Sequence, residues 1–179
     1  MGGYVWARKT ISSDTGADYA EYFEWLDGNP SNEDRVGYVV SLENEKIEYA
    51  NENDNILGII SASPAILADL SEQNWHNKYL TDDFGRPIYE TIIDPEEGEI
   101  ETPVLNPEFN PDKKYIPRAA RPEWDAVGLL GKLYARDDGT CIPGCYAKPI
   151  NGVLTFSAEP TRIQVLQRKT DNVVYTFIR

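Results

Sequence analysis

Proline is concentrated in one stretch of the chain, and that stretch limits what the chain can fold into. Seven prolines fall within the 36 positions 87–122, together with an acidic patch at 94–99. Proline lacks the backbone N–H that a sheet or a helix needs, so we expect an extended arm or a long loop there. Structureless loops of this length are uncommon inside compact domains. Two interpretations stay open: an arm that lies across a neighbouring subunit, and a flexible surface insertion.

Outside that stretch, the sequence has the short apolar runs of a β-rich domain. Runs of β-branched and aromatic residues between polar turns are typical of strands. Such runs lie at 36–42, 46–50, 56–60, 127–133, 153–156, 162–167 and 173–178. Polar turns are expected at 51–55 and 169–172, and the second of these predicts a hairpin.

One segment favours a helix. Ser63 can cap it, Pro64 suits its first position, and Ile66, Leu67 and Leu70 would share a face. The expected fold class is therefore mainly β: a sandwich-like or barrel-like core with one or two short helices and a long Pro-rich arm.

The charge and hydropathy of the chain exclude several classes of partner. Of the 179 residues, 30 are acidic and 17 basic, which gives a net charge of −13. This charge repels phosphate backbones, so no nucleic-acid partner is expected. Hydrophobic residues make up 41% of the chain, which excludes wholesale disorder. No apolar run approaches the roughly 18 residues of a membrane helix, so we expect a soluble chain with no membrane partner.

Three minor features carry little chemistry. His76 is the only histidine, and a structural role is more common than a catalytic triad built on one such residue. Cys141 and Cys145 have no histidine nearby, so we expect two reduced thiols and no metal site. The glycines at 128 and 131 faintly suggest a phosphate loop, but the spacing is short and no Ser or Thr follows Lys132.

The segment from Asp18 to Trp25 combines three carboxylates with four aromatic side chains. As a strand, it would place Glu21 on one face with Tyr19 and Phe23, where loss of contact with water favours the protonated acid. As a helix, it would be capped by Asp18 and would bring both carboxyl groups to its first turn. Either geometry makes Glu21 a usable acid or base. Capping boxes are usually structural, so the spacing alone does not establish catalysis.

Several motifs together are specific for a known family. Asp-Tyr-Ala-Glu-Tyr-Phe-Glu-Trp at 18–25 is followed by Asp-Gly-Asn at 27–29, Asp-Arg-Val-Gly-Tyr-Val-Val at 34–40 and Asn-Ile-Leu-Gly-Ile-Ile-Ser-Ala-Ser-Pro at 55–64. Trp-His-Asn at 75–77 and Trp-Asp-Ala-Val-Gly-Leu-Leu-Gly at 124–131 fit the same pattern. From position 18 onward, the chain resembles the peptidase G2 family, the C-terminal intramolecular chaperone autoprocessing domains of Bacillus phage and prophage tail appendage proteins.

The resemblance implies a domain that forms a homotrimer, promotes assembly of the upstream tail appendage or spike, and then cuts itself free. The implied cleavage site is the Ala17–Asp18 bond, with Glu21 and Asp18 as catalytic residues. Residues 1–17 would end the upstream segment, and 18–179 would form the chaperone and autocleavage domain. Assembly would take place in the cytoplasm of the host bacterium, with the domain released from the mature virion appendage. Serine commonly precedes the cut in this family, whereas Ala17 stands there in this sequence.

The implied enzyme is a self-cleaving endopeptidase of the glutamic type that turns over once, in cis or within the trimer. Hydrolysis by water that Glu21 activates is the favoured route. In a second route, the Asp18 carboxylate attacks the Ala17 carbonyl and Glu21 protonates the leaving nitrogen. No cofactor is expected from the residues, and ATP-assisted release is implied by the resemblance alone. The alternative function is a non-catalytic trimerisation domain or a tip that binds the host surface.

Overall fold

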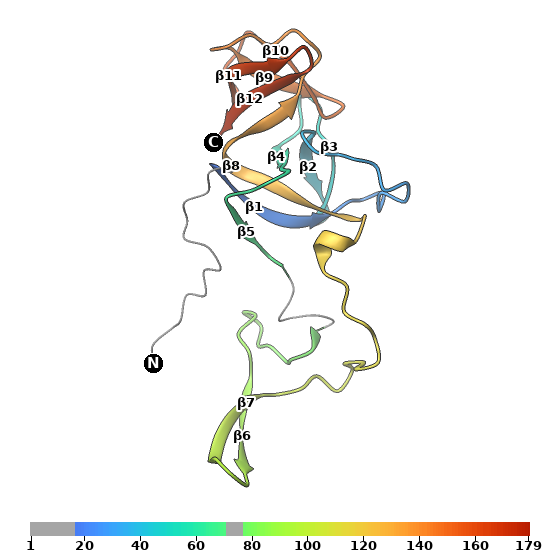
Figure 1. Cartoon of the computed structure of the whole chain (residues 1–179), viewed down its shortest axis with the longest axis vertical. Helices are drawn as coiled ribbons and strands as arrows, with labels where there is room; N and C mark the ends of the chain where they lie inside the picture. Colours follow the sequence, from blue (N-terminus) through green and yellow to red (C-terminus); the bar gives the residue numbers. More distant parts are fainter. Residues whose placement is uncertain (1–16, 71–76) are drawn as a thin grey trace. The chain divides into compact units, whose positions relative to one another are not determined.

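The computed structural model describes residues 17–70 and 77–179, which divide into two units (Figure 1). The core unit consists of 17–70 and 118–179, and the insertion unit consists of 77–117. Residues 1–16 of the expected upstream segment lie outside the described residues, and so does His76. Within the described ranges, no helix is long and apolar enough to cross a membrane.

The core unit is one mostly antiparallel sheet, as the mainly β prediction requires. Along the main path, the strand order is β10-β9-β11-β12-β8-β4-β2-β3, and β1 pairs with β8 and β5. The strands are β1 (Ala17–Glu24), β2 (Val39–Glu43), β3 (Lys46–Tyr49), β4 (Ile56–Ile60), β5 (Ile66–Ala68), β8 (Trp124–Arg136), β9 (Tyr146–Ile150), β10 (Val153–Ser157), β11 (Ile163–Thr170) and β12 (Val173–Ile178).

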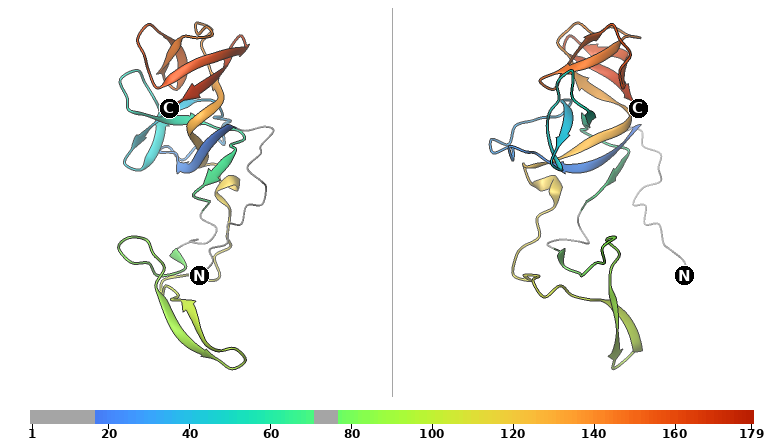
Figure 2. Two further views of the ribbon diagram at one scale, coloured as in Figure 1. Left: turned by 90° about the vertical axis from the view of Figure 1, so that its left-hand side faces the viewer. Right: turned by 180° about the vertical axis from the view of Figure 1, so that it is seen from behind.

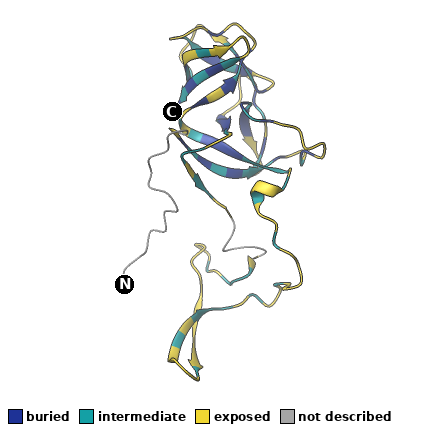
Figure 3. Cartoon of the chain, in the orientation of Figure 1, coloured by how far each residue is buried: buried dark blue, intermediate teal, exposed yellow. Residues whose placement is uncertain are grey.

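The long strand β8 organises this sheet. Its 13 residues pair antiparallel with β1, β4 and β12, and the views in Figure 2 show β1 running beside it. Buried residues gather on the strands of the core unit (Figure 3). The largest cluster is built on Ile59, Leu133 and Ile163, and a second one surrounds Trp25 and Val127. Strand β1 is therefore held against a packed core along most of its length.

The helix expected from Ser63 onward is wrong. Ile66–Ala68 forms the short strand β5, which pairs in parallel with β1, Ile66 lying opposite Tyr19. The helical signals are local, whereas pairing with β1 supplies backbone partners along the edge of the main sheet. The described residues contain no α-helix, and their helical conformation is confined to 3-10 turns such as Arg118–Ala120.

The insertion unit contains a hairpin that the proline content did not predict. Strand β6 (Tyr89–Asp94) pairs antiparallel with β7 (Gly98–Pro103). The prolines avoid the ladder positions that need an N–H: Pro95 lies in the turn, and Pro103 is the last residue of β7. No residue described in this unit is buried. Its use as an arm across a neighbouring subunit stays a prediction.

Candidate cleavage site

The segment from Ala17 to Glu24 is a strand, so its side chains alternate between the two faces of the sheet. Asp18 lies on the buried face together with Ala20 and Tyr22, whereas Glu21 lies on the half-buried face. Residues three apart in a strand are separated by about 10 Å and point to opposite faces. The structure therefore does not bring Asp18 and Glu21 together within one chain, as the helical alternative would have done.

Asp18 is a buried acid. Its residue is only 4% exposed, and its Oδ2 atom has no hydrogen-bond partner among the described residues. Burial raises the pKa of the Asp18 carboxyl, because the charged form loses its water. Hydrogen bonding from Ser61 and from the backbone of Asp18 and Ala65 opposes this rise without cancelling it. Asp18 is thus suited to hold a proton beside the bond that precedes it.

The Ala17–Asp18 bond lies against β8. Ala17 pairs with Lys132, and Asp18 pairs with Gly131. The register then shifts between Tyr19 and Ala20, which leaves a bulge in the ladder beside the bond. Bulges are frequent next to active sites, because they re-aim side chains.

The other edge of β1 is held by the segment before β5. The backbone N–H of Ala65 donates to the Asp18 carbonyl at 3.0 Å. Ala17 itself is exposed, and its side chain lies on the face of the sheet opposite that of Asp18.

Glu21 lies on a surface that continues onto β8. The Tyr19 hydroxyl donates to Glu21 Oε1, and this contact raises the pKa of Tyr19. Tyr19 pairs with Leu130 of β8, which is 53% exposed. Tyr134 follows on the same face of β8 and is also exposed. Glu21 itself pairs with the buried Val127 of β8, and its contact with Tyr19 places it near the exposed side chain of Leu130.

The far end of β1 is anchored by an arginine between aromatic rings. The Arg35 guanidinium lies 4.4 Å from the Trp25 ring and donates to both carboxylate oxygens of Asp27, at 2.8 and 2.7 Å. These bonds lower the pKa of Asp27. The Trp25 indole N–H donates to Asp125 Oδ2 at 2.8 Å, and burial raises the pKa of Asp125. Both the ring stacking and the hydrogen bonds fix where β1 ends.

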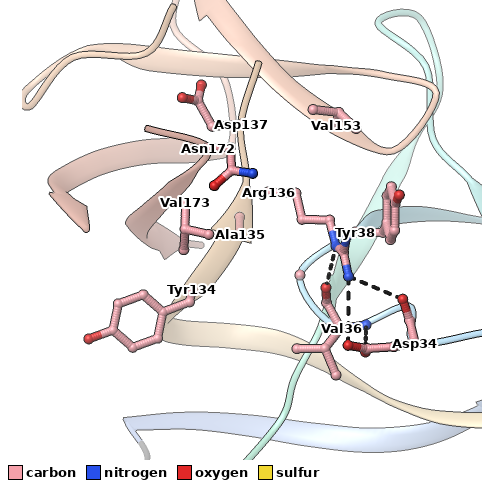
Figure 4. A pocket seen from close by; sticks show the side chains of 11 residues that line it. Asp34, Val36, Tyr38, Tyr134, Ala135, Arg136, Asp137, Val153, Asn172 and Val173 are labelled. Atoms are coloured by element: carbon pink, nitrogen blue, oxygen red, sulfur yellow. Dashed lines mark hydrogen bonds and ion pairs between the residues drawn. The ribbon is translucent and has the colours of Figure 1, made fainter. Parts of the chain in front are cut away.

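A cavity of about 440 Å³ opens elsewhere in the core unit, and none of its lining residues belongs to β1 (Figure 4). The Arg136 side chain crosses it, donating from Nε to the Val36 carbonyl at 2.8 Å and lying 4.5 Å from the Tyr38 ring. The Arg136 guanidinium therefore already has partners within the protein. Because no residue of β1 lines the cavity, the cavity is separate from the Ala17–Asp18 bond.

The cysteines play no part at this site. Cys141 and Cys145 are both free, and burial raises the pKa of the Cys141 thiol well above its usual range. A raised thiol pKa makes Cys141 a poor nucleophile. The described ranges contain no group of three or more His, Cys, Asp or Glu side chains placed to hold a metal ion.

The sequence analysis missed three residues that surround the bond: Ser61, Gly128 and Gly131. Gly128 and Gly131 belong to the family motif at 124–131, and Ser61 belongs to the one at 55–64, where it follows the buried run of β4. The motifs indicate the family but give these residues no role at the bond. Only the pairing of β1 with both β8 and β5 brings these residues to Asp18.

Comparison with known proteins places this geometry in context. Residues 1–174 match the family described as Peptidase_G2, IMC autoproteolytic cleavage domain. The pre-neck appendage protein of Bacillus phage B103 is 39% identical over 157 residues, which cover 87% of this chain and 18% of that protein. The chain therefore spans less than a fifth of the length of the curated relatives it matches.

Two solved structures are similar over most of the chain. The crystal structure of pre-mature bacteriophage phi29 gene product 12 aligns with a TM-score of 0.84 and 32% identity, over 100% of this chain and 24% of that chain. The C-terminal fragment of the same phage protein aligns with a TM-score of 0.73 and 34% identity, over 90% of this chain and 100% of the fragment.

Proposed function

Because the chain belongs to the Peptidase_G2 family of IMC autoproteolytic cleavage domains, we propose that it is the self-cleaving intramolecular chaperone of a phage tail appendage. It promotes trimerisation of the appendage or spike that precedes it in the same polypeptide. It then cuts the Ala17–Asp18 bond once. Folding and cleavage take place in the cytoplasm of the host bacterium, and the domain is released from the mature appendage.

The observation that carries this proposal is the burial of the Asp18 carboxyl next to the Ala17–Asp18 bond, with Oδ2 lacking a hydrogen-bond partner among the described residues. A carboxyl that keeps its proton beside the scissile bond can protonate the leaving nitrogen, which belongs to the same residue. A carboxylate nucleophile needs the opposite protonation state. The burial of Asp18 therefore favours attack by water over attack by the Asp18 carboxylate.

Glu21 is the general base, and it is supplied by a neighbouring copy. In a strand, the peptide plane lies roughly in the sheet, so water must reach the carbonyl carbon from one face of the sheet. The Asp18 side chain lies on the buried face, and exposed Ala17 leaves the opposite face open. Glu21 of the same chain is four residues, about 13 Å, along the strand from Ala17. Its half-buried face and the adjoining Leu130 offer the contact surface for the second copy.

The reaction is a hydrolysis. Water adds to the Ala17 carbonyl carbon while the Glu21 carboxylate accepts one of its protons. The carbon–nitrogen bond then breaks as Asp18 donates its proton to the nitrogen. The products are a carboxyl group on Ala17 and a free amino group on Asp18, and the proton on Glu21 returns to Asp18 through solvent.

The magnitudes suit a single turnover. General acid–base catalysis contributes about 10²–10⁴-fold. Holding the bond, the water and both acids in one assembled site supplies a further large factor, since effective molarities reach about 10⁵–10⁸ M. A site completed by a second copy also ensures that cleavage follows assembly.

Intact-mass measurement of the purified protein tests the function. We expect wild-type protein to yield a fragment that begins at Asp18, and Glu21→Gln to remain full length. Glu24→Gln is the matched control, because Glu24 lies on the same strand and is paired with Lys46 at 2.8 Å. It should be cut like wild type. A full-length mass in assembled wild-type protein would favour the non-catalytic trimerisation or host-binding tip.

A further inference from the structure

Two glycines of β8 lie against the proposed scissile bond. Gly131 has a φ of +117°, and a methyl group there would lie 2.4 Å from the Ala17 carbonyl oxygen and 2.8 Å from the Asp18 Cα. A methyl group on Gly128 would lie 2.9 Å from Asp18 Oδ2. Real Cβ atoms do not approach other heavy atoms this closely, so any side chain at either position would displace these groups.

We propose that Gly128 and Gly131 are positioning residues for the scissile bond, together called the glycine seat. Because Gly131 has no side chain, it leaves space for the Ala17 carbonyl, and Gly128 likewise leaves space for the Asp18 carboxyl. This inference rests on the proposed function and assigns a role to the motif that fails as a phosphate loop. The two glycines lie on either side of the bulge, whose extra residue lets both of them face β1.

The contact of Gly131 is with backbone atoms. A clash with a flexible side chain is relieved by a new rotamer, whereas the Ala17 carbonyl is fixed by its own chain and by the pairing of β1 with β8. Gly131 also pairs with Ile178 of β12 on its other edge, so β8 cannot move away to make room. A side chain at this position therefore moves the carbonyl that water must attack.

The contact of Gly128 is with the acid itself. Besides Asp18 Oδ2, a methyl group at Gly128 would meet Leu133 Cδ1 at 2.5 Å and the Ile59 carbonyl at 3.3 Å. Gly128 thus leaves the room that the unpartnered oxygen of Asp18 occupies. The bare Cα sets how close the carboxyl lies to the β8 backbone.

Gly131→Ala is the first test. We expect normal folding and assembly with cleavage about 10²-fold slower, the loss typical of reacting groups misplaced by an ångström. Gly37→Ala is the matched control: its φ is +83°, and its added methyl group would meet the Arg136 backbone of β8 at 3.2 Å, away from β1. It carries similar backbone strain and should cut at the wild-type rate. Equal rates for Gly131→Ala and wild type would overturn the proposal.

A second variant keeps the proposal testable if Gly131→Ala does not fold. Gly128→Ala combined with Leu133→Val removes the clash with Leu133 Cδ1 and keeps the contact with Asp18. Leu133→Val alone is its control. We expect the double variant to cut more slowly than this control, and equal rates would overturn the role of Gly128.

The pH profile separates positioning from a general loss of stability. A methyl group 2.9 Å from Asp18 Oδ2 pushes the carboxyl away from the hydrogen bonding of Ser61 and Ala65, which opposes the rise in its pKa, so Asp18 keeps its proton to higher pH. The alkaline limb of the cleavage rate should therefore move upward in the double variant and stay in place in Leu133→Val. An unmoved limb would contradict the assigned contact.

Few other titratable groups bear on this profile. Tyr19 and Glu21 lie on the opposite face of β1, and Lys132 lies opposite Ala17 on β8. The segment 61–68 on the other edge has no charged side chain. Wild-type protein that is never cut would refute the proposed function. Wild-type protein that is cut, with both glycine variants cut equally well, would refute only the glycine seat.

Discussion

The core unit and the insertion unit differ in how far their residues are buried. In the core unit, Ile59, Val127 and Ile163 are fully buried, and the strands share one sheet. In the insertion unit, no described residue is buried, and Phe84 and Ile93 are 85% and 82% exposed. A lone two-stranded hairpin is marginally stable in water at best. The packed core that stabilises a fold therefore lies in the core unit, whereas the insertion unit has no buried residue among those described.

The two units contain carboxyl groups whose pKa values are shifted in opposite directions. In the core unit, burial raises the pKa of Asp18 and of Asp125. In the insertion unit, Asp82 and Asp94 accept backbone N–H bonds in exposed turns, and these bonds lower the pKa of both carboxyls. Among the described residues, the carboxyl groups with a raised pKa lie in the core unit, which is where the proposed chemistry lies.

Truncating one isoleucine in each unit should give the largest difference. Ile59→Ala leaves a cavity in the main cluster and should lower the free energy of unfolding by about 2–5 kcal/mol. Ile93→Ala removes an exposed side chain and should change it by less than about 0.5 kcal/mol. Urea unfolding of both variants in the Glu21→Gln background measures the two values. Similar losses would show that the hairpin has a buried partner within the folded protein.

Removing an arginine from each unit should give a smaller contrast. Arg35→Met abolishes the ring contacts with Trp25 and Tyr49 and the bonds to Asp27, and we expect a loss of roughly 2–4 kcal/mol. Arg86→Met breaks an exposed pair with Asp82 and should cost less than about 1 kcal/mol. Thermal unfolding followed by near-UV circular dichroism reports both losses. Equal losses of stability in the two variants would mean that the burial of Arg35 adds nothing to the stability of the folded protein.

Substitution of Arg118, at the end of the core unit next to the insertion, should have a smaller effect on stability. Arg118 pairs with Asp69 and lies 3.9 Å from the Trp124 ring, so it ties together the two ends of the core unit that flank the insertion. Arg118→Ala should cost about 1 kcal/mol and increase proteolysis at 69–70. Arg118→Lys keeps the charge and should be intermediate. Unchanged proteolysis of Arg118→Ala would show that this tie does not hold the junction.

The smallest effect should appear only as a pH dependence. Because the folded-state pKa of Asp18 is raised above its ordinary value of 3.8, the folded protein binds more protons than the unfolded chain above that pH. Stability is then lost as pH rises through the folded-state pKa, and Asp18→Asn should remove this loss. Asp94→Asn should do the opposite, because a lowered pKa stabilises the folded form above 3.8. Because the Asp94 contribution is lost only as pH falls below 3.8, denaturation is measured between pH 2 and pH 8 in the Glu21→Gln background. Curves for Asp18→Asn and Asp94→Asn that run parallel to the Glu21→Gln curve over this whole range would contradict both assignments.

Much of the fold could be predicted from local sequence. The runs at 56–60 and 173–178 fall within β4 and β12, because short apolar runs between polar turns have few alternatives. Strand β9 was missed because Pro149 interrupts its pattern. The helix expected at Ser63 failed because β5 pairs with β1, a contact between distant residues that no local signal records.

The site was predictable only in part. The segment 18–25 and its acids were identified, but the choice between strand and helix depends on pairing with β8. That choice decides the chemistry, since it separates Asp18 from Glu21 and buries the first of them. The two glycines of the seat became visible only once β8 was placed beside the scissile bond.

The central claim is that one copy supplies the scissile bond and Asp18 while its neighbour supplies Glu21. Co-assembly of a Glu21→Gln chain with an Asp18→Asn chain of different mass tests it directly. Each variant alone should stay full length. In the mixture, mass spectrometry should find the Glu21→Gln chain cut before Asp18 and the Asp18→Asn chain intact. A mixture in which both chains stay full length, with assembly demonstrated, would contradict the account.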